Sequence, residues 1–135
     1  MRDSLKEGRR WLEQAIEDLK WAKDLAGKGR ISHCFLAQQI GDKALKAFLY
    51  YKREDIVVGH SIERLCHACS KYDESFADKS KKWAILDSYY VPTRYPNSIP
   101  DSIPARIYTR DYAIEAVKMA EEIVEFVKKR IHGAD

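Results

Sequence analysis

The residues best suited to binding lie in one proline-rich segment of the chain. All four prolines fall between Pro92 and Pro104, and an arginine and several tyrosines lie just before or within the start of this stretch: Tyr89, Tyr90, Arg94 and Tyr95. Proline forbids a helix here and restricts the backbone, so these side chains lose little entropy on contact with a ligand. We predict an ordered loop that serves as a contact surface. The alternative is a structural cap over one end of the fold.

A second candidate is a polar stripe on the helix predicted from Ser32 to about Lys52. Apolar residues of this segment form a broad arc that predicts the core, and Gly41 within it is small enough for a neighbour to approach closely. A separate narrow stripe comprises Gln39, Lys43, Lys46 and Tyr50. We predict that the stripe faces water or a partner. Two interpretations stay open: an ordinary solvated face and an anion-facing row.

Cys66, His67 and Cys69 have a spacing that a zinc site could use, and His60 lies about two helical turns earlier. A second pair of cysteines is missing, and Cys34 lies among the core residues of another predicted helix. Cysteine is also among the most frequently buried residue types. The sequence therefore predicts buried thiols and no metal site.

Composition narrows the class of protein. The 135 residues suit one domain with a single core. With 24 Lys and Arg against 21 Asp and Glu, the net charge of +3 is too balanced to indicate nucleic-acid binding by itself. The odd cysteine count and the start of the sequence predict a cytoplasmic protein. No apolar stretch approaches the roughly 20 residues that cross a bilayer, so no membrane span is expected. A charged fraction of 33% with Asn97 as the sole asparagine is typical of heat-adapted proteins.

Apolar periodicity predicts helices along nearly the whole chain and no strands. Trp21 lies off the apolar stripe of its helix, which makes it a candidate for a dimer interface. The fold class is therefore an all-α up-and-down bundle of four or five helices, with the proline-rich loop before the last one. The predicted helices run from Asp3 to about Ala26, Ser32 to about Lys52, Ser61 to about Lys71, Asp73 or Ser75 to just before Pro92, and Thr109 to about His132.

Several motifs occur together in a recognisable order. They are Cys34–Gln39 with Lys43–Ala47, Gly59–Ile62 with Leu65, Tyr89–Pro96, and Asp111–Ala113. Together they resemble the HEPN domain, the higher eukaryote and prokaryote nucleotide-binding group, and within it the non-ribonuclease branch associated with minimal nucleotidyltransferases. The resemblance spans nearly the whole chain.

The resemblance implies a helical bundle that is commonly dimeric and often works with a small nucleotidyltransferase. The chain lacks the Gly-Ser and paired-aspartate pattern of such transferases, so a transferase partner would act in trans. No cofactor is expected, apart from a nucleotide as ligand. The positions that the resemblance connects with nucleotide or partner contact are Arg94, Tyr95, Tyr90, Lys43, Lys46, Gln39 and His60.

Some relatives in the wider group are ribonucleases with an arginine, four to six residues, and then a histidine. Arg53 and His60 have this spacing, so a metal-independent, toxin-like ribonuclease of a toxin and antitoxin pair is one alternative. The residues around the pair depart from the usual ribonuclease pattern, and His60 directly precedes Ser61, where a helix is predicted to begin. This favours a helix-capping or core-edge role for His60. A homodimeric scaffold without a small ligand is the other alternative.

Overall fold

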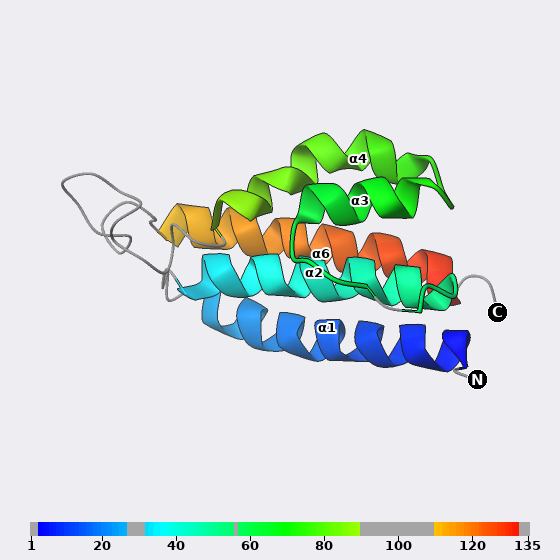
Figure 1. The fold of residues 1–135 in the computed structure, drawn as a ribbon. Helices are drawn as coiled ribbons and strands as arrows, with labels where there is room; N and C mark the ends of the chain where they lie inside the picture. The colour runs from blue at the N-terminus through cyan, green and yellow to red at the C-terminus, as the bar shows by residue number, and fades with distance from the viewer. Residues whose placement is uncertain (1–2, 27–31, 56, 90–109, 133–135) are drawn as a thin grey trace.

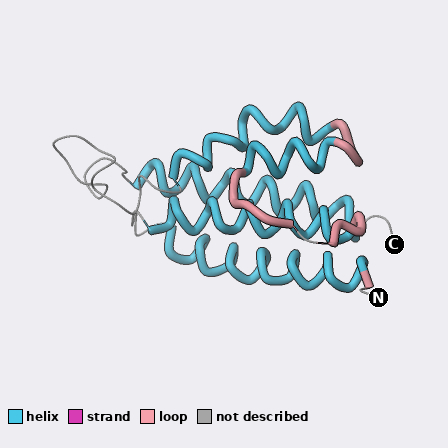
Figure 2. The backbone as a smooth tube through the Cα atoms, in the orientation of Figure 1, coloured by secondary structure: helices cyan, strands magenta, loops and turns pink. Residues whose placement is uncertain are grey.

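The computed structural model describes residues 3–26, 32–55, 57–89 and 110–132, and the ordered structure in these ranges is helical (Figures 1 and 2). This confirms the all-α fold class. Tyr90, Arg94 and Tyr95 lie outside the described residues, as does Thr109. The helices are α1 (Ser4–Ala26), α2 (Ser32–Tyr51), α3 (Ile62–Ser70), α4 (Ser75–Trp83), the 3₁₀-helix η1 (Ala84–Tyr89) and α6 (Arg110–His132).

Helix α2 is the centre of the bundle. It packs against α1, α6, α3 and η1, and α1 also contacts α6. Figure 1 shows α1, α2 and α6 as long rods lying side by side, with α1 and α2 antiparallel, while the α3–α4 hairpin lies on the other side of α2 from α1. Nearly every residue of α2 from Cys34 to Tyr50 is therefore buried or half-buried.

Two glycines allow the long helices to approach closely. A Cβ atom at Gly8 of α1 would lie 2.7 Å from Tyr51 Cβ and 2.8 Å from the Ala47 carbonyl oxygen of α2. A Cβ at Gly41 would lie 3.0 Å from Ile123 Cδ1 of α6, which confirms the predicted close approach at this residue. A larger side chain at Gly8 would push α1 away from the α2 backbone, whereas one at Gly41 would displace only the ends of neighbouring side chains.

The start of α3 is fixed by two side chains. Ser61, rather than His60, is the N-cap, and its hydroxyl oxygen accepts a hydrogen bond from Arg64 N–H at 3.2 Å. Asp87 of η1 accepts from Ile62 N–H at 2.7 Å and from Glu63 N–H at 3.1 Å. The sequence predicted one continuous helix up to Pro92, whereas α4 tightens into η1 at Ala84. The tightened turn brings Asp87 to the unpaired amides of α3.

A continuous apolar core connects the layers. Its aromatic part contains Phe48, Phe76 and Trp83, and the ring of Phe126 packs edge-on against the latter two at 5.0 and 5.1 Å between centroids. Trp21 is exposed on α1, as predicted from its position off the apolar stripe. In the described part of the chain, the helices are all too short or too polar to span a bilayer.

Candidate functional site

A polar ridge runs along α2 beneath the segment that leads to α3. Its members follow one another at four-residue steps: Gln38, Asp42, Lys46 and Tyr50. All four are buried, with Lys46 and Tyr50 only 5% and 8% exposed. The prediction that Lys46 and Tyr50 face water or a partner is therefore wrong. Residues 57–61 cross this face of α2 and cover it, which the helical period of α2 alone does not reveal.

His60 is attached to the ridge at three points. Its Nδ1 atom lies 3.1 Å from Asp42 Oδ2 and 3.4 Å from Lys46 Nζ, and its carbonyl oxygen accepts a hydrogen bond from Gln38 Nε2 at 2.5 Å. Lys46 Nζ lies 3.1 Å from Asp42 Oδ1, so the Asp42 carboxylate faces both the ammonium and the imidazole. Asp42 and Lys46 are almost fully buried, whereas the His60 side chain is 52% exposed. The ridge thus holds one histidine in a defined position at the surface.

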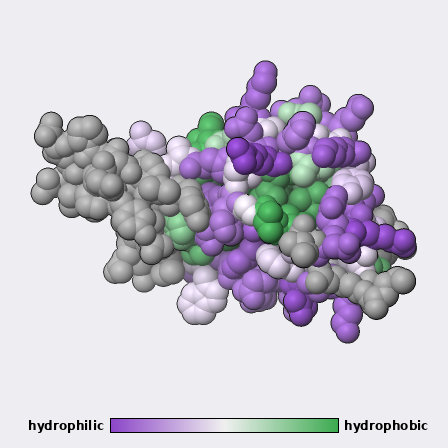
Figure 3. All heavy atoms as spheres, in the orientation of Figure 1, coloured by the Kyte–Doolittle hydropathy of each residue, from purple (hydrophilic) through white to green (hydrophobic). Residues whose placement is uncertain are grey.

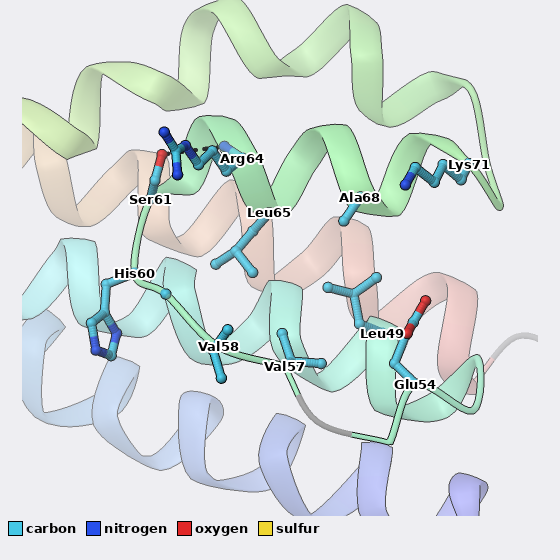
Figure 4. A pocket seen from close by; sticks show the side chains of 11 residues that line it. Leu49, Glu54, Val57, Val58, His60, Ser61, Arg64, Leu65, Ala68 and Lys71 are labelled. Atoms are coloured by element: carbon cyan, nitrogen blue, oxygen red, sulfur yellow. Dashed lines mark hydrogen bonds between the residues drawn. The ribbon is translucent and has the colours of Figure 1, made fainter.

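His60 stands at one end of a groove of about 510 Å³ between residues 57–61 and α3 (Figure 4). Apolar side chains line its floor and the near wall: Leu49, Val57, Val58, Leu65 and Ala68. The space-filling view shows hydrophobic side chains gathered on this face, with hydrophilic ones around them (Figure 3). Charged and polar groups complete the lining, namely Glu54, His60, Ser61, Arg64 and Lys71. The groove therefore joins an apolar surface to a mostly cationic rim.

The other predicted stripe residues lie elsewhere. Lys43 Nζ forms an ion pair with Asp18 Oδ2 of α1 at 2.6 Å, and Lys43 lines a separate pocket of about 420 Å³ together with Arg10, Trp11 and Gln14. Gln39 is half-buried and donates to Gln38 Oε1 at 3.3 Å. The structure thus separates Lys43 from His60. The meeting of Arg94, Tyr95 and Tyr90 with the lysines stays a prediction, because these three residues lie outside the described part.

Arg53 follows the C-terminal end of α2, where it is exposed and has a positive φ of 75°. His60 instead contacts α2 at Asp42, which lies about 13 Å along the helix axis before Tyr51 at the usual rise per residue. The cationic side chains that share the groove with His60 are Arg64 and Lys71. Sequence spacing paired His60 with Arg53, whereas the groove pairs it with cations of α3.

The cysteines are buried thiols, as predicted. Burial raises the pKa of Cys34 to about 11 and, with a further contribution from Asp87, that of Cys66 to about 12. Burial also raises the pKa of Cys69, whose Sγ lies 3.7 Å from the Leu45 carbonyl oxygen. His67 is exposed on α3. Within the ranges that the structure describes, His, Cys, Asp and Glu side chains do not gather in threes as a metal site would require.

Sequence reasoning missed Asp42, Arg64 and Lys71. Asp42 lies four residues from both Gln38 and Lys46, a step that puts polar side chains on one helical face, and this signal was available. Arg64 and Lys71 are seven residues apart on α3, which also indicates one face. What was absent from the pattern is the path of residues 57–61, which covers the polar face of α2 and brings His60 to the groove that Arg64 and Lys71 line.

Comparison with known proteins settles the family. The family model of the HEPN domain matches residues 9–130. The chain belongs to the HEPN domain family. The crystal structure of TT1696 from Thermus thermophilus is similar to this HEPN chain, with 39% identity and a TM-score of 0.76 over 91% of this chain and 97% of that one.

A second solved structure similar to this HEPN chain is ST0689, described as an archaeal HEPN homologue. It shares 30% identity with a TM-score of 0.71, over 93% of this chain and 98% of that one. No curated protein matches the sequence.

Proposed function

We propose that this HEPN domain binds a nucleotide in the groove between residues 57–61 and α3, and that it does so without catalysing a reaction itself. The observation that carries the proposal is the pairing of an apolar lining with three cationic or polarisable side chains, His60, Arg64 and Lys71. The volume of about 510 Å³ lies in the usual range for small-molecule sites.

Each part of a nucleotide has a counterpart in this groove. The ring of a base has an apolar surface to cover at Val57, Val58 and Leu65. A phosphate group has the guanidinium fork of Arg64 and the ammonium of Lys71 within the same lining. Among the described residues of the lining, the only carboxylate is Glu54, whose Oε1 accepts a hydrogen bond from Tyr72 O–H at 2.6 Å. The excess of cations over carboxylates favours an anionic ligand.

Titration of the full chain with labelled nucleoside monophosphates tests the proposal. Arg64→Ala and Lys71→Ala should each weaken binding roughly tenfold, since each removes a charge-assisted contact. Lys20→Ala is the matched control, because it removes the same charge from α1, on the far side of α2. Flat titrations with all common nucleotides would reject the proposal.

A protein partner is the second part of the same hypothesis. The side chain of Trp21 is 66% exposed on α1, and large exposed aromatic residues are typical of interfaces. We expect a homodimer, or a complex with a nucleotidyltransferase supplied in trans. Light scattering on the wild type and on Trp21→Glu should show a dimer that the substitution converts to a monomer. A monomeric wild type that captures no transferase from a native extract would contradict this part.

The ribonuclease alternative keeps one observation in its favour. Asp42 holds the His60 imidazole at 3.1 Å, an arrangement that acid–base catalysis uses to orient a histidine. If His60 cleaves RNA, metal-free incubation should give cuts in the wild type that disappear in His60→Ala. RNA that stays intact would remove the alternative.

A further inference from the structure

A second groove lies on the other side of α3, between α3 and α4. It encloses about 840 Å³, and its lining is almost entirely polar. Cationic or polarisable groups come from both helices, namely Arg64 and His67 of α3 and Lys81 of α4. Of the described residues that line it, Glu63 is the single carboxylate and Ala77 the single apolar residue. The groove therefore offers charge and hydrogen bonds but no surface for an apolar ring.

The cations of this region differ in whether they are already neutralised. Lys82 Nζ of α4 lies 2.7 Å from Glu122 Oε2, and Lys79 Nζ lies 3.9 Å from Glu122 Oε1. In contrast, the side chains of Arg64, Lys71 and Lys81 make no ion pair or side-chain hydrogen bond within the described residues. These three cations are the ones that line the two grooves. An anionic ligand would give them partners.

Arg64 connects the two grooves, since it lines both. Arg64 and His67 of α3 and its C-cap Lys71 are spaced by three and four residues, so they follow the face of the helix that separates the two grooves. Arg64 and Lys71 are about 10 Å apart along the helix axis. A ligand that crosses α3 would meet cations on both sides, with Arg64 at the crossing point.

We propose that the α3–α4 groove is a second anion subsite, in which Arg64, His67 and Lys81 bind another phosphate group of the same ligand that occupies the α2–α3 groove. The inference rests on the proposed nucleotide site and extends it. The ligand then carries phosphate groups on both sides of α3, as a 5′-phosphorylated dinucleotide or a longer single strand does and a nucleoside monophosphate does not. The groove with the apolar lining takes a base, and the polar groove takes the phosphate that follows.

The test compares ligands of increasing length on the full chain: adenosine monophosphate, a 5′-phosphorylated adenosine dinucleotide with two phosphate groups, and adenine oligonucleotides of the RNA and the DNA type. Affinity should rise from the monophosphate to the dinucleotide. Lys81→Ala should weaken binding of the dinucleotide and the oligonucleotides roughly tenfold and leave the monophosphate unchanged. For the oligonucleotides, Lys81→Ala should also make the plot of log affinity against log salt concentration less steep by about 0.7, the value of one lost phosphate contact. Lys20→Ala, which removes the same charge from α1, should change none of these values.

The outcomes separate the two proposals. If the monophosphate binds and longer ligands bind no tighter, or if Lys81→Ala behaves as Lys20→Ala does, the second subsite is overturned while the nucleotide site stands. If only the longer ligands bind and Lys81→Ala weakens them, the second subsite stands, and the proposal that the α2–α3 groove binds a single nucleotide by itself is overturned. If no ligand of the series binds, both are overturned. Equal affinity for RNA and DNA would assign recognition to the phosphates, and a preference for RNA would add a contact with the 2′-hydroxyl.

Discussion

Asp42 Oδ2 and His60 Nδ1 lie 3.1 Å apart, so a buried carboxylate in the middle of α2 holds the last residue before the cap of α3. The same carboxylate neutralises the buried Lys46 ammonium at 3.1 Å. One side chain therefore supports both the internal charge balance of the bundle and the edge of the groove. Its removal should affect stability as well as ligand binding.

Asp42→Asn should destabilise the protein by about 3 kcal/mol or more, because the Lys46 ammonium would be left buried without a counter-charge. Urea denaturation measures the change in the free energy of unfolding. Asp18→Asn, which breaks the more exposed ion pair with Lys43, is the control and should cost no more than about 1 kcal/mol. Asp42→Leu combined with Lys46→Met should recover most of the loss. Equal losses of unfolding free energy for Asp42→Asn and Asp18→Asn would show that the buried ion pair contributes no more to stability than the exposed one.

Gly8→Ala should cost more stability than Gly41→Ala. Both substitutions gain the same helix propensity, so the comparison isolates packing. The new Cβ at Gly8 would meet a backbone oxygen at 2.8 Å, whereas the one at Gly41 would meet the tips of isoleucine side chains at 3.0 and 3.2 Å, which can move. We expect a loss of about 1–3 kcal/mol for Gly8→Ala in thermal or urea unfolding. A larger loss at Gly41 would contradict the close contact of α1 with α2.

Acid should destabilise the α4 side of the bundle through two carboxylates. A hydrogen bond from the Ser75 hydroxyl, followed by one from Arg130, lowers the pKa of Asp73, and hydrogen bonds from Lys82 and then Trp83 lower the pKa of Glu122. Because both pKa values are lower in the folded protein, the unfolded chain binds more protons as the pH falls. Their contribution is present above about pH 4.5 and is lost as the pH falls through the folded values.

Urea midpoints measured between pH 7 and pH 2.5 check this expectation. The urea midpoint of the wild type should fall below about pH 4.5. The double variant Glu122→Gln with Asp73→Asn should have a lower midpoint than the wild type at pH 7, and its midpoint should fall less on acidification. A double variant whose curve runs parallel to that of the wild type would show that other groups cause the acid dependence.

The thiols should be nearly inert in the folded protein. Thiolate is the reactive form, and burial raises the pKa of Cys34 to about 11 and that of Cys66 to about 12. A chromogenic disulfide reagent at pH 8 should therefore react slowly with the native chain and rapidly with all three cysteines after denaturation. Fast reaction of the native protein would indicate that the α3 side of the core opens readily.

The sequence was sufficient for most of the helices because of their apolar stripes, but it did not predict that α4 tightens into η1 at Ala84. The broad arc of α2 and the close approach at Gly41 were predictable from the same periodicity. The polar face of α2 was harder to interpret. Lysine is usually exposed, so the helical period predicts that Lys46 faces water or a partner. In the structure, residues 57–61 cover Lys46, and Asp42 compensates its charge.

The candidate site was predicted only in part for the same reason. His60, which the resemblance connects with nucleotide or partner contact, lines the groove, but its neighbours Arg64 and Lys71 come from a segment whose placement depends on how residues 57–61 pass over α2. The local preferences of residues 57–61 for helix or loop do not predict that path. The pairing with Arg53 followed linear spacing, whereas the segment returns His60 to the middle of α2.

Gln38, Asp42 and Tyr50 hold residues 57–61 against α2. Hydrogen exchange in this segment can therefore report the binding of a ligand in the groove. A molecule that contacts both His60 and Lys71 would tie this crossing segment to α3, and mass action would then favour the closed arrangement over local openings. Deuterium uptake at the amides of Val57 and Ile62 should slow on saturation, which would reveal a bound compound even where no spectroscopic label reports it.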